Sequence, residues 1–173
     1  DIVGVAMVRV MGAIMTGIIM TGRTGASFAA ELGIMQTNEE IDALRTLGIS
    51  PVEFLVMPRV LALVLMMPLL TLYADLMGIF GGYLVGVGML GLNPVEYLSR
   101  TQAAVGINNL KVGLLHSVVF GVIIAISGCF RGMQCGRSAA AVGESTTSAV
   151  VTGITSIVIA TAIITYICQL LGV

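Results

Sequence analysis

Long apolar runs without a charged residue dominate this sequence of 173 residues. The run 112–130 is a charge-free 19-mer, 145–173 has 29 residues without a charge, and 2–22 is interrupted only by Arg9. A helix needs about 20 apolar residues to cross the roughly 30 Å hydrocarbon core of a bilayer. We therefore predict spanning helices at about 2–22, 112–130 and 148–171.

A fourth apolar stretch, 55–92, is too long for one upright span and too short for two. As one continuous helix, its 38 residues would be about 57 Å long. Two spans with a turn between them would need somewhat more than about 40 residues. We expect one span here that is either tilted or broken near Gly81 and Gly82. The predicted fold is an all-α membrane bundle with four spanning helices, in a single domain over residues 1–173.

The composition excludes several other classes of protein. Hydrophobic residues make up 57% of the chain and charged residues 10%, against roughly a quarter charged in a soluble domain. With a mean hydropathy of +1.06, the chain has too little polar surface to cover a core in water. The apolar excess also argues against disorder. The net charge of −1 and a single lysine argue against a nucleic-acid partner.

Neither an enzyme nor a metal site is indicated by the reactive residues. The three cysteines, Cys129, Cys135 and Cys168, lack the ligand spacing of a closed zinc site, so we interpret them as small apolar side chains. The only lysine, Lys111, does not follow a glycine, which excludes a G-x-x-x-x-G-K-[ST] phosphate loop. His116 lies in an apolar run and is interpreted as a packed side chain. No catalytic residue, cofactor or metal is expected in this chain.

The polar stretches between the predicted spans carry unequal positive charge. The stretches 23–53 and 131–147 together hold four arginines, Arg23, Arg45, Arg131 and Arg137. The stretch 93–111 holds two basic residues, Arg100 and Lys111. Cytoplasmic loops are enriched in Lys and Arg. The distribution favours a cytoplasmic location for the first and third stretches, which also agrees with a single span at 55–92.

A short amphipathic helix is predicted at about 38–47 in the first polar stretch. The sequence Thr37-Asn38-Glu39-Glu40 matches a capping box, and Gly48 is placed to end the helix. Apolar residues recur at three-residue spacing, at Ile41, Leu44 and Leu47. Charged residues lie on the other faces of the helix, at Glu39, Glu40, Asp42 and Arg45. Such a helix is either a lid on the bundle or a docking element, and spacing alone leaves both open. Further helix starts are predicted at Ser50-Pro51 and Asn93-Pro94.

Polar residues and glycines inside the apolar windows give further expectations. Asp75 would cost about 2.5–3.5 kcal/mol at the bilayer centre, so it should face protein or a water-filled cavity. Arg9 is a second charge inside a predicted span. Gly78, Gly82 and Gly86 recur every four residues and predict a smooth ridge for close helix contact, within a subunit or between subunits.

Four segments of the sequence form a distinctive series: GRTGAS at 22–27, AELGIM at 30–35, EEIDAL at 39–44 and AVGESTTSAVV at 141–151. They resemble the permease family of Mla-type phospholipid ABC transporters (MlaE). The resemblance covers nearly the whole chain with the motifs in order. Two departures stand out: Val10 and Ala13 replace an acid and a proline of the family's R-E-x-G-P motif, and Glu144 stands where a basic or neutral residue is common.

The resemblance implies a homodimeric permease in the bacterial inner membrane, with five spanning helices per subunit, of which this chain holds four. It implies a separate cytoplasmic ABC ATPase that binds ATP and Mg²⁺, a periplasmic MCE-domain lipid-binding protein and a small STAS-type cytoplasmic subunit. The implied substrate is a glycerophospholipid, moved between the inner membrane and the outer envelope. An interfacial helix and a first span would precede the present sequence.

The resemblance also favours docking over a lid for the helix at 38–47. That helix would be the coupling helix, with candidate residues Glu31, Glu39, Glu40, Asp42, Leu44, Arg45 and Leu47 contacting the ATPase. Two other hypotheses remain open on the sequence alone. One is a secondary ion-coupled carrier that uses Asp75 as its ion site, and the other is a membrane scaffold assembled through the glycine ridge.

Overall fold

The computed structural model describes residues 2–172 and contains helices but no strand within that range. Its first part is a continuous helical column made of α1 (Ile2–Ala6), η1 (Met7–Met11), α2 (Gly12–Met20), η2 (Thr21–Gly25) and α3 (Ala26–Thr37). The short helix α4 (Glu40–Thr46) follows. The remaining elements are η3 (Val52–Val56), α5 (Met57–Gly88), α6 (Pro94–Ala104), α7 (Ile107–Met133) and α8 (Ala139–Leu170). The segments η1, η2 and η3 are single π-helical turns.

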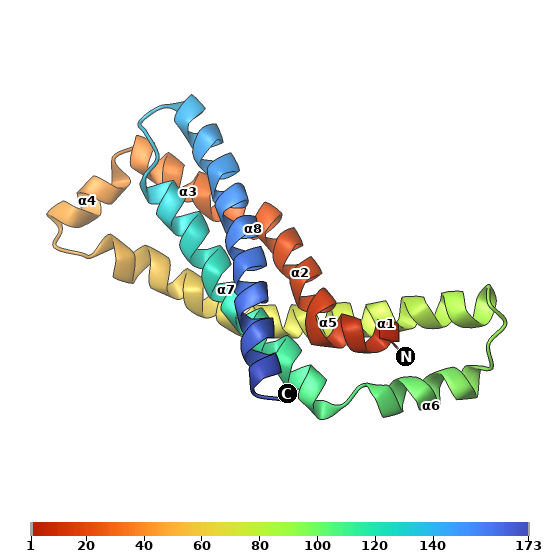
Figure 1. Cartoon of the computed structure of the whole chain (residues 1–173). Helices are drawn as coiled ribbons and strands as arrows, with labels where there is room; N and C mark the ends of the chain where they lie inside the picture. The colour runs from red at the N-terminus through yellow and green to blue at the C-terminus, as the bar shows by residue number, and fades with distance from the viewer. Residues whose placement is uncertain (1, 173) are drawn as a thin grey trace.

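Four helices are long and apolar enough to cross a membrane: Ile2–Thr37, Val52–Gly88, Ile107–Met133 and Ala139–Leu170. This confirms the predicted all-α fold with four spanning helices. At 1.5 Å per residue each is longer than the roughly 30 Å hydrocarbon core. Each helix must therefore tilt or extend beyond the membrane, and Figure 1 shows the four crossing at different inclinations.

The first helix is longer than the apolar run that predicted it. We expected the span to end near residue 22, but the helix continues to Thr37. Arg23 and Glu31 lie on its exposed side, whereas Leu32 is fully buried on the other. A helix can continue past charged residues when they leave one apolar stripe free to pack. The charges therefore marked the end of the apolar run but not the end of the helix.

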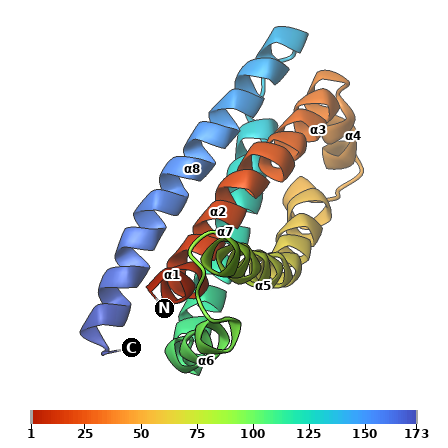
Figure 2. The ribbon, with the colours of Figure 1, turned by 90° about the vertical axis from the view of Figure 1, so that its right-hand side faces the viewer.

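The second spanning helix, η3 with α5, is one unbroken helix through Gly81 and Gly82. The break expected as one of the two forms of 55–92 does not occur at these glycines, so a single span here must tilt or extend beyond the membrane. Pro68 lies inside α5, and the helix continues on both sides of it. Figure 2 views α5 nearly end-on while α8 is seen along its length, so the two helices cross at a large angle.

Helix α7 forms the centre of the bundle, packed between the first helix, α5 and α8. The core around it consists of Ala13, Leu63, Met67, Phe120, Ile124, Ala125 and Ile157. His116 is fully buried, its Nδ1 lies 2.8 Å from the carbonyl oxygen of Val112, and its ring contacts that of Phe120 edge-on. The histidine is a packed core residue, as its apolar run indicates.

Glycines on α7 allow backbones of other helices to approach closely. A Cβ added to Gly128 would lie 2.7 Å from the carbonyl oxygen of Gly25, and one added to Gly132 would lie 2.9 Å from that of Ala29. Gly113 and Gly121 face the backbones of Val8 and Leu63 in the same way. Small residues at such crossings permit the close van der Waals packing that holds membrane helices together.

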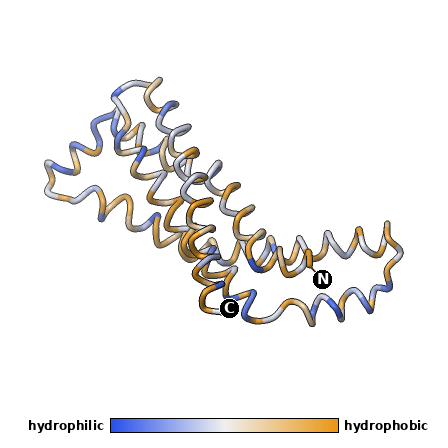
Figure 3. Tube along the Cα trace, viewed as in Figure 1, coloured by the Kyte–Doolittle hydropathy of each residue, from blue (hydrophilic) through white to orange (hydrophobic). Residues whose placement is uncertain are grey.

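Polar residues gather at the two ends of the bundle, with apolar residues between them (Figure 3). One end carries α4 and the connection between α7 and α8. The other end carries the α5–α6 turn and α6. The two arginine-rich stretches predicted to be cytoplasmic, 23–53 and 131–147, thus reach the same end of the molecule.

Candidate functional site

Helix α4 projects from the arginine-rich end of the bundle, between the end of α3 and the start of η3 (Figure 1). Gly48, with φ of 77°, ends it. The Gly48 N–H donates to the Arg45 carbonyl (3.1 Å) and the Ile49 N–H donates to the Leu44 carbonyl (3.0 Å). This pair of bonds is a Schellman motif. The prediction that Gly48 ends this helix is confirmed.

The start of α4 differs from the predicted capping box. Thr37 belongs to α3, and its hydroxyl donates to the Gly33 carbonyl at 2.9 Å. Glu39 is the residue before the helix; it has φ of 61° and makes no side-chain cap. Because the Thr37 hydroxyl is used within the preceding helix, it cannot cap the next one. The capping-box prediction at Thr37 was wrong, and α4 begins at Glu40.

Arg137, from the connection between α7 and α8, holds the acidic face of α4. Its Nη1 donates to Glu39 Oε1 at 3.1 Å, and its Nη2 donates to Asp42 Oδ2 at 2.8 Å. Asp42 also accepts from Arg45 at 3.3 Å. Two of the acids predicted to contact a partner therefore have partners within the chain. In the sequence, Arg137 contributed only to the predicted topology, because no local spacing signals a contact with residues about a hundred positions away.

The apolar residues of α4 divide between the bundle and solvent. Ile41 is buried and Leu44 is half-buried, whereas Leu47 is 74% exposed. Beyond Leu47, further apolar side chains are exposed along the connection to α5. We call the group Leu47, Ile49, Val52 and Phe54 the α4–η3 apolar surface. The three-residue spacing of Ile41, Leu44 and Leu47 thus runs from the core outward and does not form one exposed face.

Glu31 does not join the α4 cluster to which it was assigned. It lies on α3 and accepts a hydrogen bond at 2.8 Å from Arg59 of α5. The Arg59 guanidinium also lies over the ring of Phe28, 5.0 Å from its centre. This contact links the first and second spanning helices near their arginine-rich ends, so Glu31 braces the bundle and leaves α4 untouched.

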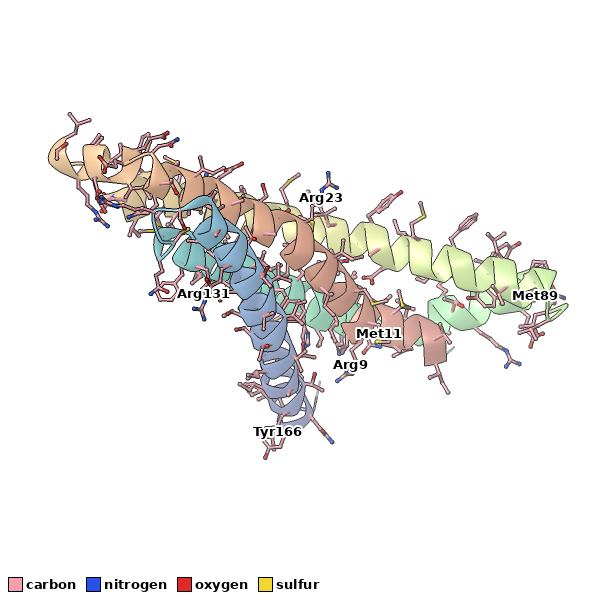
Figure 4. The ribbon with its side chains drawn as sticks, turned by 90° about the horizontal axis from the view of Figure 1, so that it is seen from above. Arg9, Met11, Arg23, Met89, Arg131 and Tyr166 are labelled. Carbon is pink, nitrogen blue, oxygen red and sulfur yellow. The ribbon has the colours of Figure 1, made fainter. Side chains whose placement is uncertain are left out.

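Asp75 is buried, with 4% of its surface exposed, and it packs against Gly12 of the first helix. Its Oδ1 has no hydrogen-bond partner among the described residues. Arg9 lies close to Gly12 in sequence, but its Nη1 donates to Asn109 of α7 at 3.1 Å. Figure 4 shows Arg9 and Met11 on the first helix, where the π-turn η1 leads into Gly12. Asp75 therefore faces protein, not lipid.

The glycine ridge of α5 receives side chains instead of another backbone. Gly82 and Gly86 face the ring of Tyr97 on α6, and Gly78 faces the side chain of Met7. The rings of Tyr83 and Tyr97 meet edge-on, with centres 5.8 Å apart. The close helix contact expected at this ridge occurs elsewhere, along α7, where Gly113, Gly128 and Gly132 face the first helix and Gly121 faces α5. The available sequence signal was the recurrence of these glycines along one apolar run.

The geometry defines a multi-pass all-α membrane protein with a short helix held at its arginine-rich end. Residues 1–167 match the family described as Permease MlaE, and the chain belongs to this family. It is 42% identical over 164 residues to a probable ABC transporter permease protein of Rickettsia typhi, covering 95% of this chain and 63% of the relative.

Two more distant relatives also match most of this chain but a smaller share of their own length. A probable ABC transporter permease protein of Synechocystis is 39% identical over 158 residues, covering 91% of this chain and 60% of the relative. The chloroplastic protein TRIGALACTOSYLDIACYLGLYCEROL 1 of Arabidopsis thaliana is 36% identical over 159 residues, covering 92% of this chain and 45% of the relative. The chain thus spans less than two thirds of the length of these relatives.

Proposed function

We propose that this chain is the membrane-spanning part of an ATP-driven transporter, and that α4 is where a separate cytoplasmic ATPase binds. The observation that carries the proposal is the α4–η3 apolar surface, which is exposed directly after α4, the helix that Arg137 fixes to the rest of the bundle. The names of the Rickettsia and Synechocystis relatives support an ABC permease. The absence of a phosphate-loop lysine from this sequence is consistent with ATP hydrolysis, and its Mg²⁺, on another subunit.

The free energies of apolar burial and of exposed ion pairs favour docking through apolar residues. Burying an exposed leucine contributes roughly 1.5–3 kcal/mol, whereas an exposed ion pair contributes about 0–1 kcal/mol. Leu47 would therefore supply more binding free energy than either Glu40 or Arg45, the two charges of α4 that Arg137 does not hold. Glu40 and Arg45 would mainly orient the partner.

The proposed substrate is a glycerophospholipid, moved between the bacterial inner membrane and the outer envelope. Membership of the MlaE family supports this, and the Arabidopsis relative is named after a glycerolipid. A homodimer, a periplasmic MCE-domain protein and a small STAS-type subunit complete the proposed assembly. The wide exposure of apolar residues on α5 and α8 leaves surface for both lipid and a second subunit.

The test is reconstitution of the permease in vesicles with a candidate ABC ATPase from the same organism. Fluorescent glycerophospholipid should be transferred to an acceptor only when ATP and Mg²⁺ are present. A variant of the ATPase that binds but does not hydrolyse ATP is the control. Transfer at equal rates without nucleotide would contradict the proposal.

A secondary carrier is the competing function, because Asp75 is a buried carboxylate with an oxygen that lacks a partner among the described residues. A carrier of this kind would transport when a proton or sodium gradient is applied without ATP. The same vesicles can be tested with gradient alone, and flux under that condition that is lost in Asp75→Asn would favour the carrier.

A further inference from the structure

A polar pocket of about 230 Å³ lies between the end of α7 and the start of α8. Its polar lining residues are Arg131, Gln134, Glu144, Ser145 and Ser148. It lies on the arginine-rich end of the bundle but involves neither α4 nor the α4–η3 apolar surface. None of the contacts described for α4 requires this pocket.

The positive group in the pocket is Arg131. Its Nη2 donates to Thr152 Oγ1 at 3.2 Å, and its Nε is buried without a hydrogen-bond partner among the described residues. A buried donor without a partner carries an unrecovered desolvation cost. Figure 4 shows Arg131 beside α8. The guanidinium is thus fixed by its contact with Thr152, and Arg131 lines the pocket.

The negative group is Glu144, which is exposed and makes no ion pair or hydrogen bond with the described residues. Glu144, Ser148 and Thr152 recur every four residues and so lie along one face of α8. Eight residues of helix correspond to roughly 12 Å. Thr152, which holds Arg131, therefore lies about two helical turns along α8 from Glu144, with Ser148 between them.

The pocket lies beside the start of the last charge-free apolar run, 145–173. Glu144 is the last charged residue of the chain, and the charge-free stretch 145–173 begins directly after it. Below the pocket, α8 exposes Val151, Val158 and Ile159. The polar pocket thus lies at the level where a bilayer changes from head groups to hydrocarbon, with apolar helix surface continuing from it.

We infer that this pocket binds a phosphate group that carries a primary amine two carbons away, as in the head group of phosphatidylethanolamine. Arg131 and Ser148 donate to the phosphate oxygens, and Glu144 accepts from the ammonium. A phosphate and an ammonium, each at hydrogen-bonding distance from its partner, would span the roughly 12 Å of α8 between Thr152, which holds Arg131, and Glu144. The adjoining apolar surface of α8 receives an acyl chain. This inference needs only the membrane placement of the chain and is independent of the proposed transport function.

The experiment measures lipid retained by the purified chain. Protein is exchanged into detergent containing equal amounts of phosphatidylethanolamine and phosphatidylglycerol with identical acyl chains, and bound lipid is counted by native mass spectrometry. A charge-assisted hydrogen bond to the amine predicts a preference for phosphatidylethanolamine of about tenfold or more. Glu144→Gln should reduce this ratio to near one. Arg131→Gln should reduce retention of both lipids, and Arg131→Lys should restore part of it.

Matched controls neutralise charges at the other end of the bundle. Glu96→Gln and Arg100→Gln alter an exposed ion pair on α6 and should leave the lipid ratio unchanged. Equal retention of the two lipids by the parent chain would overturn the inference. An unchanged ratio in Glu144→Gln would do the same, and this variant should fold because Glu144 is exposed and makes no ion pair with the described residues.

The source of the phosphate is tested with soluble glycerophosphoethanolamine. Excess of this compound should not displace the bound lipid, because it lacks the acyl chains that contact α8. Displacement at concentrations comparable to those of the lipid would overturn assignment to a lipid head group. No ATPase or nucleotide is present in any arm, so failure here and failure of the proposed transport function are separate results.

Discussion

Arg137 Nη2 donates to Asp42 Oδ2 at 2.8 Å, joining the connection between α7 and α8 to helix α4. Through Nη1 the same guanidinium holds Glu39 at 3.1 Å. One arginine therefore binds two of the acids that were expected to contact the ATPase. Any movement of the joined ends of α7 and α8 would be transmitted to α4 through this side chain. The proposed ATPase would then recognise the α4–η3 apolar surface.

Arg137→Gln should loosen α4 without unfolding the bundle. Both ion pairs are exposed, and such pairs contribute about 0–1 kcal/mol each, so the thermal midpoint should fall by a small amount at most. Amide hydrogen exchange in residues 38–50 should increase severalfold, because α4 loses its tether to the α7–α8 connection. Arg100→Gln, which breaks an ion pair on α6, is the matched control. Unchanged exchange in 38–50 would show that the arginine does not hold α4.

Leu47→Asp should weaken binding of the ATPase roughly ten- to hundredfold, because a leucine buried at an interface contributes about 1.5–3 kcal/mol. Leu47 is 74% exposed, so the bundle should remain folded. Leu44→Asp should also uncouple ATP hydrolysis from transport more than Glu39→Ala does, although Leu44 is half-buried and its variant will lose some stability. Glu40→Gln is the control for α4 charge. The measurements are co-purification of the ATPase and lipid-stimulated hydrolysis.

Two outcomes would contradict docking through the α4–η3 apolar surface. If Leu47→Asp binds the ATPase as tightly as the parent chain, α4 is a lid and the coupling element lies elsewhere. If Glu40→Gln weakens binding more than Leu47→Asp, charge and not apolar burial determines docking.

The spanning helices were predictable because hydrocarbon thickness imposes a length that can be counted in the sequence. The residues at which the helices end were less predictable. Arg23 and Glu31 interrupt an apolar run, yet backbone hydrogen bonding continues wherever the opposite side of the helix packs, as Leu32 does. Local turn chemistry also had limits: Gly48 ends α4 as predicted, whereas the Thr37 hydroxyl is used by the preceding helix.

Contacts between distant residues could not be predicted from spacing. Arg137 and Asp42 are joined only because α3 packs against α7 and α8, which brings their connections together. The glycine spacing on α5 predicted close contact with another helix, but spacing does not show that the side chain of Tyr97 covers Gly82 and Gly86. For the same reason Glu31 was grouped with neighbours in sequence, while its ion-pair partner, Arg59, comes from another helix.

Asp75→Asn should preserve both folding and ATP-driven lipid transfer. The amide has nearly the shape of the carboxylate, and the carboxylate Oδ1 makes no hydrogen bond with the described residues that would be lost. Burying a neutral group also costs less than burying a charge. The measurements are yield of monodisperse protein and ATP-dependent transfer, with Asp75→Leu as the variant that changes shape. Loss of transfer by Asp75→Asn in folded protein would instead assign the carboxylate a part in transport.

Gly82→Leu should destabilise the bundle, whereas Gly81→Leu should not. A Cβ at Gly82 would lie 2.7 Å from the hydroxyl of Tyr97, while one at Gly81 meets open space. Leucine in place of a helical glycine gains up to about 1 kcal/mol in helix propensity at either position, but at Gly82 overpacking costs roughly 1–3 kcal/mol and displaces the ring from Tyr83. Thermal unfolding in detergent should give a lower midpoint for Gly82→Leu than for Gly81→Leu. Adding Tyr97→Ala should remove most of the difference, because the two sites are in contact; equal midpoints for the two glycine variants would mean that Tyr97 does not occupy this ridge.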